Sequence, residues 1–237
     1  MKKIILPFIL AVALAVPVAA QTAPAKAVTS SARSQMTAQS VIDNYFTALG
    51  GKTKLEAVKS TIMENTMSLQ GMEITMTTKK MGNKFKSVQS VMGQEMSQVF
   101  DGEKGVIDQM GQKKDFPADK IAELKKGKTL EALSYNAANF TSVSTEQIDG
   151  KNYNVLTSDK GKFFFDANTG LLYRSITKKS EMGVSVESTA TIKSYFEADG
   201  IKFPKDIEAE ANGQKVNITT SKVTVNSGVS DADFKIN

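Results

Sequence analysis

The segment 59–110 most constrains the fold, because apolar and polar residues alternate along it with the two-residue period of β-strands. It also holds eight of the eleven methionines of the chain. In its first part, one face of two strands joined by a turn at Gln70–Gly71 would carry Met63, Met67, Leu69, Met72, Ile74 and Met76. Flexible thioether side chains fit irregular apolar objects. This face therefore suits either ordinary core packing under a helix, which the alternation alone explains, or a bound lipid chain.

Helical periodicity is confined to two parts of the chain. Between Thr37 and Leu49 one apolar stripe predicts an amphipathic helix that ends at Gly50–Gly51, and its members are Val41, Ile42, Tyr45, Phe46 and Leu49. Two further short helices are predicted over Ala118–Lys126 and Thr129–Tyr135. We expect these short helices to lie across the sheet.

Strand patterns resume at Phe140 and continue to the end of the chain, separated by turn pairs such as Asp149–Gly150 and Asn212–Gly213. About ten or eleven strands are predicted in total, which is more than a flat open sheet usually holds. We therefore predict a mainly β (α+β) fold. Its strongly curved antiparallel sheet would form a half-barrel or incomplete barrel, with the N-terminal helix and the short helices covering the concave side.

The first residues have the pattern of a secretory signal peptide over 1–20, with a basic start, an apolar run and a small-residue cleavage site at Val18–Ala20. A flexible leader over 21–36 and a single domain over 37–237 would follow. The chain has no cysteine, so it has neither disulfides nor the lipidated cysteine of a bacterial lipoprotein. We expect a soluble, unanchored periplasmic protein whose mature part contains no transmembrane segment.

Catalytic chemistry is poorly represented in this sequence, which contains no histidine and no cysteine. A Ser-His-Asp triad is thus excluded, and an enzyme with a Ser-Lys or carboxylate site is the least favoured class. Asp101, Glu103 and Asp108 lack the spacing of a known calcium loop, so we expect no metal or cofactor. The lysine clusters are not interleaved with aromatic residues, which argues against nucleic-acid binding.

Three stretches resemble a known family: NYFTALGGKTKLEAVKS, GKFFFDANTGLLYR, and YFEADGIKFPKDIEAEANGQ together with NSGVSDADFKIN. They are similar to periplasmic domains of Bacteroidota related to the LolA-like superfamily of outer-membrane lipoprotein-sorting proteins. The resemblance implies an incomplete barrel with a helical lid and acyl chains in its concavity. Related domains occur fused to insulinase-type zinc peptidases, but the missing histidines exclude transfer of that activity. A lid-contacting arginine of true carriers would have to be Arg33 or Arg174.

The predicted function is a non-catalytic periplasmic carrier or chaperone that holds lipid or lipoprotein acyl chains, with segment Ala118–Tyr135 acting as a lid. Its candidate lining residues are Met63, Met67, Leu69, Met72, Ile74, Met76, Met92, Met96, Phe100 and Met110. The alternative is an accessory module with a self-filled core that binds a periplasmic or outer-membrane protein, such as a peptidase, through a sheet edge or an exposed face.

Overall fold

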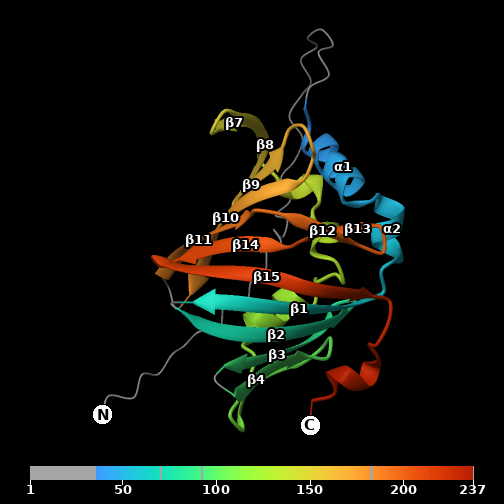
Figure 1. Ribbon diagram of the computed structural model, residues 1–237, viewed down its shortest axis with the longest axis vertical. Helices are drawn as coiled ribbons and strands as arrows, with labels where there is room; N and C mark the ends of the chain where they lie inside the picture. Colours follow the sequence, from blue (N-terminus) through green and yellow to red (C-terminus); the bar gives the residue numbers. More distant parts are fainter. Residues whose placement is uncertain (1–35, 70, 92, 182–183, 237) are drawn as a thin grey trace.

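The computed structural model describes residues 36–69, 71–91, 93–181 and 184–236 (Figure 1). The predicted signal peptide and nearly all of the predicted leader lie outside these ranges. The first half of the sheet comprises β1 Ser60–Leu69, β2 Met72–Met81, β3 Lys84–Val91, β4 Gln94–Phe100, β5 Gly105–Gln109 and β6 Gln112–Asp115. The second half comprises β7 Ser142–Ile148, β8 Lys151–Ser158, β9 Gly161–Asp166, β10 Leu172–Glu181, β11 Val184–Ile192, β14 Asp206–Ala211 and β15 Gln214–Val225. A separate hairpin pairs β12 Tyr195–Ala198 with β13 Ile201–Pro204.

Thirteen of these strands form one antiparallel sheet, in the order β6-β5-β4-β3-β2-β1-β15-β14-β11-β10-β9-β8-β7. The sheet is not closed, since β6 and β7 are its two edges. The predicted class, an open curved antiparallel sheet with few helices, is confirmed. The strands outnumber the ten or eleven expected because β6 and β13 have only four residues each, too few for a clear period, and because 184–198 is divided between β11 and β12.

The tight turns follow the chemistry that the sequence predicts for them. Asp149–Gly150 and Asn212–Gly213 both have positive φ at each residue, 49° and 76° in the first pair and 52° and 73° in the second. Two consecutive residues with positive φ are the requirement of a type I′ hairpin, whose twist matches that of the flanking strands. These turns fix the register of the long strands on either side of them.

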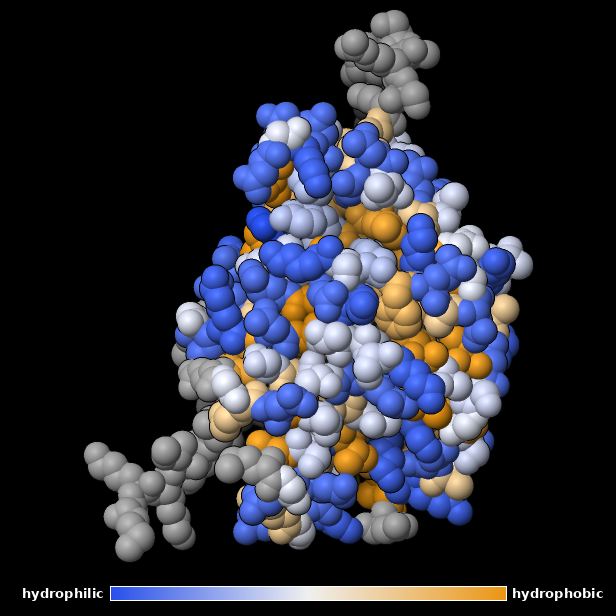
Figure 2. All heavy atoms as spheres, viewed as in Figure 1, coloured by the Kyte–Doolittle hydropathy of each residue, from blue (hydrophilic) through white to orange (hydrophobic). Residues whose placement is uncertain are grey.

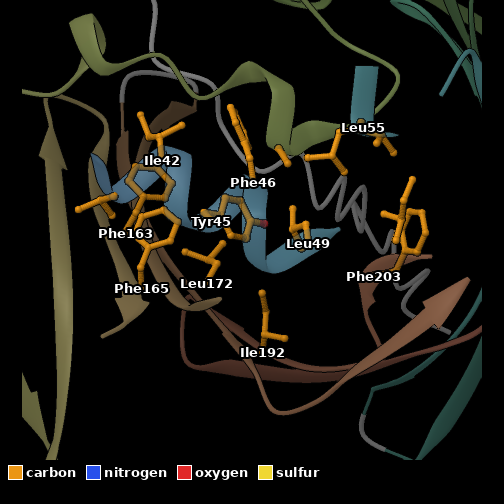
Figure 3. Close-up of a cluster of buried hydrophobic side chains, with 14 of the residues drawn as sticks. Ile42, Tyr45, Phe46, Leu49, Leu55, Phe163, Phe165, Leu172, Ile192 and Phe203 are labelled. Atoms are coloured by element: carbon orange, nitrogen blue, oxygen red, sulfur yellow. The ribbon is translucent and has the colours of Figure 1, made fainter. Parts of the chain in front are cut away.

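Helix α1 Ala38–Leu49 covers one half of the concave face. Its N-terminus is fixed by a capping box in which the Ser40 amide donates to Thr37 Oγ1 at 3.1 Å and the Thr37 amide donates to Ser40 Oγ at 3.0 Å. The five apolar residues of the predicted stripe are all buried, as expected. They form one cluster with Phe163, Phe165, Leu172 and Ile192 of the second half of the sheet and with Phe203 of the β12–β13 hairpin, and Figure 3 shows Tyr45 beside Phe165 and Leu172. The short helix α2 Lys52–Ala57 adds Leu55 to this main core.

The chain has to travel from edge strand β6 to the opposite edge strand β7, and it does so through residues 116–141, here called the crossing segment. It contains helix α3 Ala118–Leu124 and the 3-10 turns η1 Glu131–Ser134 and η2 Ala137–Asn139. In Figure 1 this green to yellow segment lies behind the central strands. Of the helix predicted over Thr129–Tyr135, only the single 3-10 turn η1 forms, because Leu130 and Tyr135 on either side of it have extended conformations. An extended chain covers about twice the distance per residue of an α-helix, which suits a connection that spans the sheet.

The C-terminal 3-10 turn η3 Asp231–Phe234 packs on the other side of the sheet. Lys79 Nζ lies 2.5 Å from Asp233 and Lys84 Nζ lies 2.5 Å from Asp231. Both lysines stand on the outer face of β2 and β3, since Met76 and Gln89 at alternating positions face inward. In Figure 2, which views this outer side, hydrophilic and intermediate residues predominate and hydrophobic ones form separate patches.

Candidate functional site

The concave face of β14, β15, β1 and β2 carries an apolar cluster, here called the seam cluster. Its buried members are Met67, Leu69, Ala209, Val216 and Ile218, and Ile74, Met76 and Ile207 pack against them. The register pairs Met67 with Ile74 and with Ile218, so these side chains are neighbours on one face. Every residue of the cluster comes from a strand. No helix among the described residues contributes a hydrophobic side chain to it, in contrast to the main core under α1.

The structure places six of the ten candidate lining residues together on β1 and β2. Met67 and Leu69 are 4% and 3% exposed, and Ile74 and Met76 are partly buried beside them. Met63 lies further along the same face and packs against the main core. Met72 is partly buried opposite Leu69. The two-strand arrangement predicted from alternation is therefore the observed one.

The remaining candidates separate. Met96 continues the concave face on β4, and Phe100 is fully buried next to Phe85, with 6.3 Å between the ring centroids. Met110 does not belong to this face: it occupies the turn between β5 and β6 with a φ of 53°, and 66% of it is exposed. A residue at such a turn projects away from the sheet, which alternation counting does not detect. Met92 lies outside the described residues.

Sequence reasoning missed the polar residues of the concave face. Asn65, Ser87, Gln89 and Gln98 face inward on β1, β3 and β4 and are only 8–9% exposed. The alternation of β3 was compatible with either face, because Val88 and Phe85 point to opposite sides. The pairing of Met76 with Gln89 assigns the glutamine to the inside. Ser87, Gln89, Met96, Gln98, Ile107 and Gln109 line a small pocket of about 10 Å³, the space of one water molecule.

Three tyrosines lie where the crossing segment meets α1. The rings of Tyr45 and Tyr135 are edge-to-face with centroids 5.8 Å apart, and the Tyr195 hydroxyl donates to the Leu172 carbonyl at 2.7 Å. Burial raises the pKa of all three hydroxyls, so they stay neutral at physiological pH. The hydroxyls of Tyr135 and Ser134 are buried without a hydrogen-bond partner in the described part of the chain. The crossing segment therefore has two buried hydroxyl groups whose hydrogen-bonding capacity is not used in its observed position.

The described residues include no group of three or more acidic side chains that could hold a metal ion. Asp101 accepts hydrogen bonds from the amides of Glu103 and Lys104 in its own turn, and Asp108 accepts from the Gly111 amide. These carboxylates serve local turns instead of gathering around a common point. The helices in the described ranges include none with the length and hydropathy needed to cross a membrane.

Arg174, one candidate for a lid contact, lies on the outer face. A register shift between Leu172 and Arg174 places Tyr173 and Arg174 on the same side of β10. The guanidinium stands over the Tyr173 ring at 5.0 Å and donates from Nε to Thr191 Oγ1 at 3.1 Å. It therefore points away from the crossing segment. The other candidate, Arg33, lies outside the described residues.

Comparison with solved structures identifies the architecture. A LolA superfamily protein from Nitrosomonas europaea matches with a TM-score of 0.55 and 12% identity, over 85% of this chain and 98% of the other. A DUF1329 family protein from Desulfovibrio piger matches with a TM-score of 0.52 and 13% identity, over 84% of this chain and 97% of the other. No family model matches the sequence, and no curated protein is significantly similar to it. The chain therefore has a LolA-like fold, recognised from its structure.

Proposed function

We propose that this protein is a periplasmic carrier or chaperone that holds the acyl chains of a lipid or lipoprotein against the concave face of its sheet, without catalysis. The observation that carries the proposal is the seam cluster. Its eight apolar residues come from adjacent strands, and α1 packs on the other half of the concave face. A LolA-like fold with such a cluster places apolar strand residues beside a core that α1 fills.

The physical basis of binding would be apolar burial. Each methylene group removed from water contributes about 0.8 kcal/mol, so ten methylenes supply about 8 kcal/mol before ordering costs. Unbranched side chains such as Met67 and Met76 adapt to chains of different length and saturation. Selectivity for chain length would consequently be low, as suits a carrier of mixed cellular lipids.

The crossing segment is the proposed lid. It is held to the strand ends by Thr129, whose hydroxyl accepts from the Gly82 amide at 2.8 Å and donates to the Lys59 carbonyl at 3.2 Å. Glu131 of η1 pairs with Lys80 at 3.7 Å. Helix α3 has no buried residue, and the two unpartnered hydroxyls of η1 and its C-cap lower the cost of moving this segment.

The first test is native mass spectrometry, with lipid extraction, of the mature protein purified from the periplasm. A co-purifying lipid or lipopeptide near one per chain would support the carrier and identify its ligand class. A ligand-free mass, together with failure to take up added lipid, would refute the carrier. That result would favour the accessory module with a protein partner.

The second test compares two aspartate substitutions at adjacent positions of β2. Met76→Asp places a charge on the concave face, whereas Thr75→Asp places it on the exposed outer face. We expect Met76→Asp to lower lipid retention at least about tenfold and Thr75→Asp to leave it unchanged, because desolvating a carboxylate beside an acyl chain is costly. Circular dichroism confirms that both variants fold. Equal retention by the two variants would remove Met76 from the binding face.

A further inference from the structure

A row of alternating amide and thioether side chains crosses the concave face from β1 to β5. The strand register places its members as direct cross-strand neighbours, in the order Asn65, Met76, Gln89, Met96 and Gln109. Ser87 and Gln98 are also direct cross-strand neighbours, on β3 and β4. Each lies two residues from the member of the row on its own strand and faces the same side. The row borders the seam cluster through Met76, which packs against that cluster.

The amides of this row have hydrogen-bonding capacity that the described protein groups leave unused. Gln89 Nε2 donates to Met76 Sδ at 3.6 Å, and a thioether is a weak acceptor. The side chains of Asn65, Gln98 and Gln109 receive no hydrogen bond from the described residues. Asn65, Gln89 and Gln98 are nevertheless more than nine-tenths buried. The buried side-chain atoms without a partner in the described ranges are the hydroxyls of Thr61, Ser134 and Tyr135, so the amide atoms of the row keep access to solvent and are available to a ligand.

The side chains that form the row and line its pocket are uncharged. Lys80, which faces inward on β2, is engaged with Glu131 of the crossing segment. The pocket beside the row is lined by glutamine, serine, methionine and isoleucine alone. Lys114, the cross-strand neighbour of Ile107, stands exposed on edge strand β6, so its solvated charge would compensate little for the desolvation of a carboxylate or phosphate in the row. Primary amides both donate and accept, so they match an uncharged carbonyl or hydroxyl group.

We infer that the amide row binds the uncharged carbonyl linkage of an acylated ligand, the ester or amide that joins the acyl chain to its polar part. The inference rests on the proposed carrier function. The acyl chain would lie on the seam cluster, and its first carbonyl would accept from Gln89 and Gln98. The protein would then select esters and amides of fatty acids over free fatty acids and over ether-linked chains.

The experiment compares two probes that differ only at the linkage, dioctanoylglycerol and di-O-octylglycerol, with octanoate as the charged probe. Binding is measured by native mass spectrometry and by competition against a fluorescent acyl ester. We expect the ester to bind about tenfold more tightly than the ether, the effect of one or two hydrogen bonds. Octanoate should bind most weakly. An N-octanoyl dipeptide tests the amide linkage. Tighter binding of the dipeptide would indicate an acylated peptide as the ligand and tighter binding of the glycerol ester would indicate a glycerolipid, and either result would support the inference.

The variant Gln89→Leu/Gln98→Leu should reduce the ester-to-ether ratio to about one while ether binding persists, because leucine preserves volume and apolar contact. Such a replacement inside an apolar surface is well tolerated. Gln147→Leu, at an exposed position of β7, is the matched control and should keep the wild-type ratio. Equal binding of ester and ether by the wild-type protein, or an unchanged ratio in the double variant, would overturn the inference alone. Failure of all probes to bind would instead overturn the carrier function.

Discussion

The same substitution, tyrosine to phenylalanine, is expected to have opposite effects at two positions of the main core. The Tyr135 hydroxyl is buried without a partner, whereas the Tyr195 hydroxyl donates to the Leu172 carbonyl at 2.7 Å. Removing an unsatisfied buried hydroxyl recovers its desolvation cost, about 1–3 kcal/mol. Removing a satisfied one forfeits a net hydrogen bond of about 0.5–1.5 kcal/mol and leaves the carbonyl without that donor. Tyr135→Phe should stabilise the protein and Tyr195→Phe should destabilise it.

The difference between the two variants is then about 1.5–4.5 kcal/mol, which for a domain of this size separates their thermal midpoints by about 3–18 °C. Urea unfolding followed by circular dichroism measures the free energies, and equal m-values would show that the unfolded state is unchanged. Ser134→Ala, which removes the second unpartnered hydroxyl, provides an independent replicate with the same sign. If Tyr135→Phe lost as much stability as Tyr195→Phe, the hydroxyl would have a partner and the argument for a loosely held crossing segment would fail.

Three further perturbations test the packing and the electrostatics. Gly105→Ala would place its Cβ within the Phe116 ring and should cost about 1–3 kcal/mol; adding Phe116→Leu should recover part of that loss in a double-mutant cycle. Gly161→Ala should be more damaging in urea unfolding than Gly150→Ala, because its Cβ would overlap a backbone carbonyl of β10, whereas the space around the other is open. Hydrogen bonds from the hydroxyls of Ser194, in the link between β11 and β12, and of Thr219, on β15, lower the pKa of Asp206 below 3.8. Its contribution to stability is therefore full above pH 3.8 and is lost as the pH falls through the lower folded value. Urea midpoints measured against pH should show this slope in the wild-type protein and a smaller one in Asp206→Asn.

The parts predicted correctly from the sequence are those with a strong period. The apolar stripe of α1 and the shared face of β1 and β2 were both predicted correctly. Burial of one side makes apolar residues recur every 3.6 residues in a helix and every two residues in a strand. Met110 was assigned to the concave face because it fits the two-residue period of the sequence. It lies in a turn, however, where the alternation of inward and outward side chains ends. The buried glutamines were missed for a related reason: a polar residue on a strand is taken to face solvent, and only the pairing with Met76 places Gln89 inside. The crossing segment is extended around η1 because it has to span the sheet, a requirement set by topology.

The neighbour relation of β1 and β15 has a consequence for how the chain folds. Each half of the sheet is a local meander, but the two halves join at pairs such as Thr61 with Val225, which are far apart in the sequence. Contacts of such long separation form slowly, because closing the loop costs entropy before any contact repays it. A nascent chain that still lacks its last strands cannot complete the sheet. The native sheet therefore becomes accessible only after the residues of β15 have been synthesised.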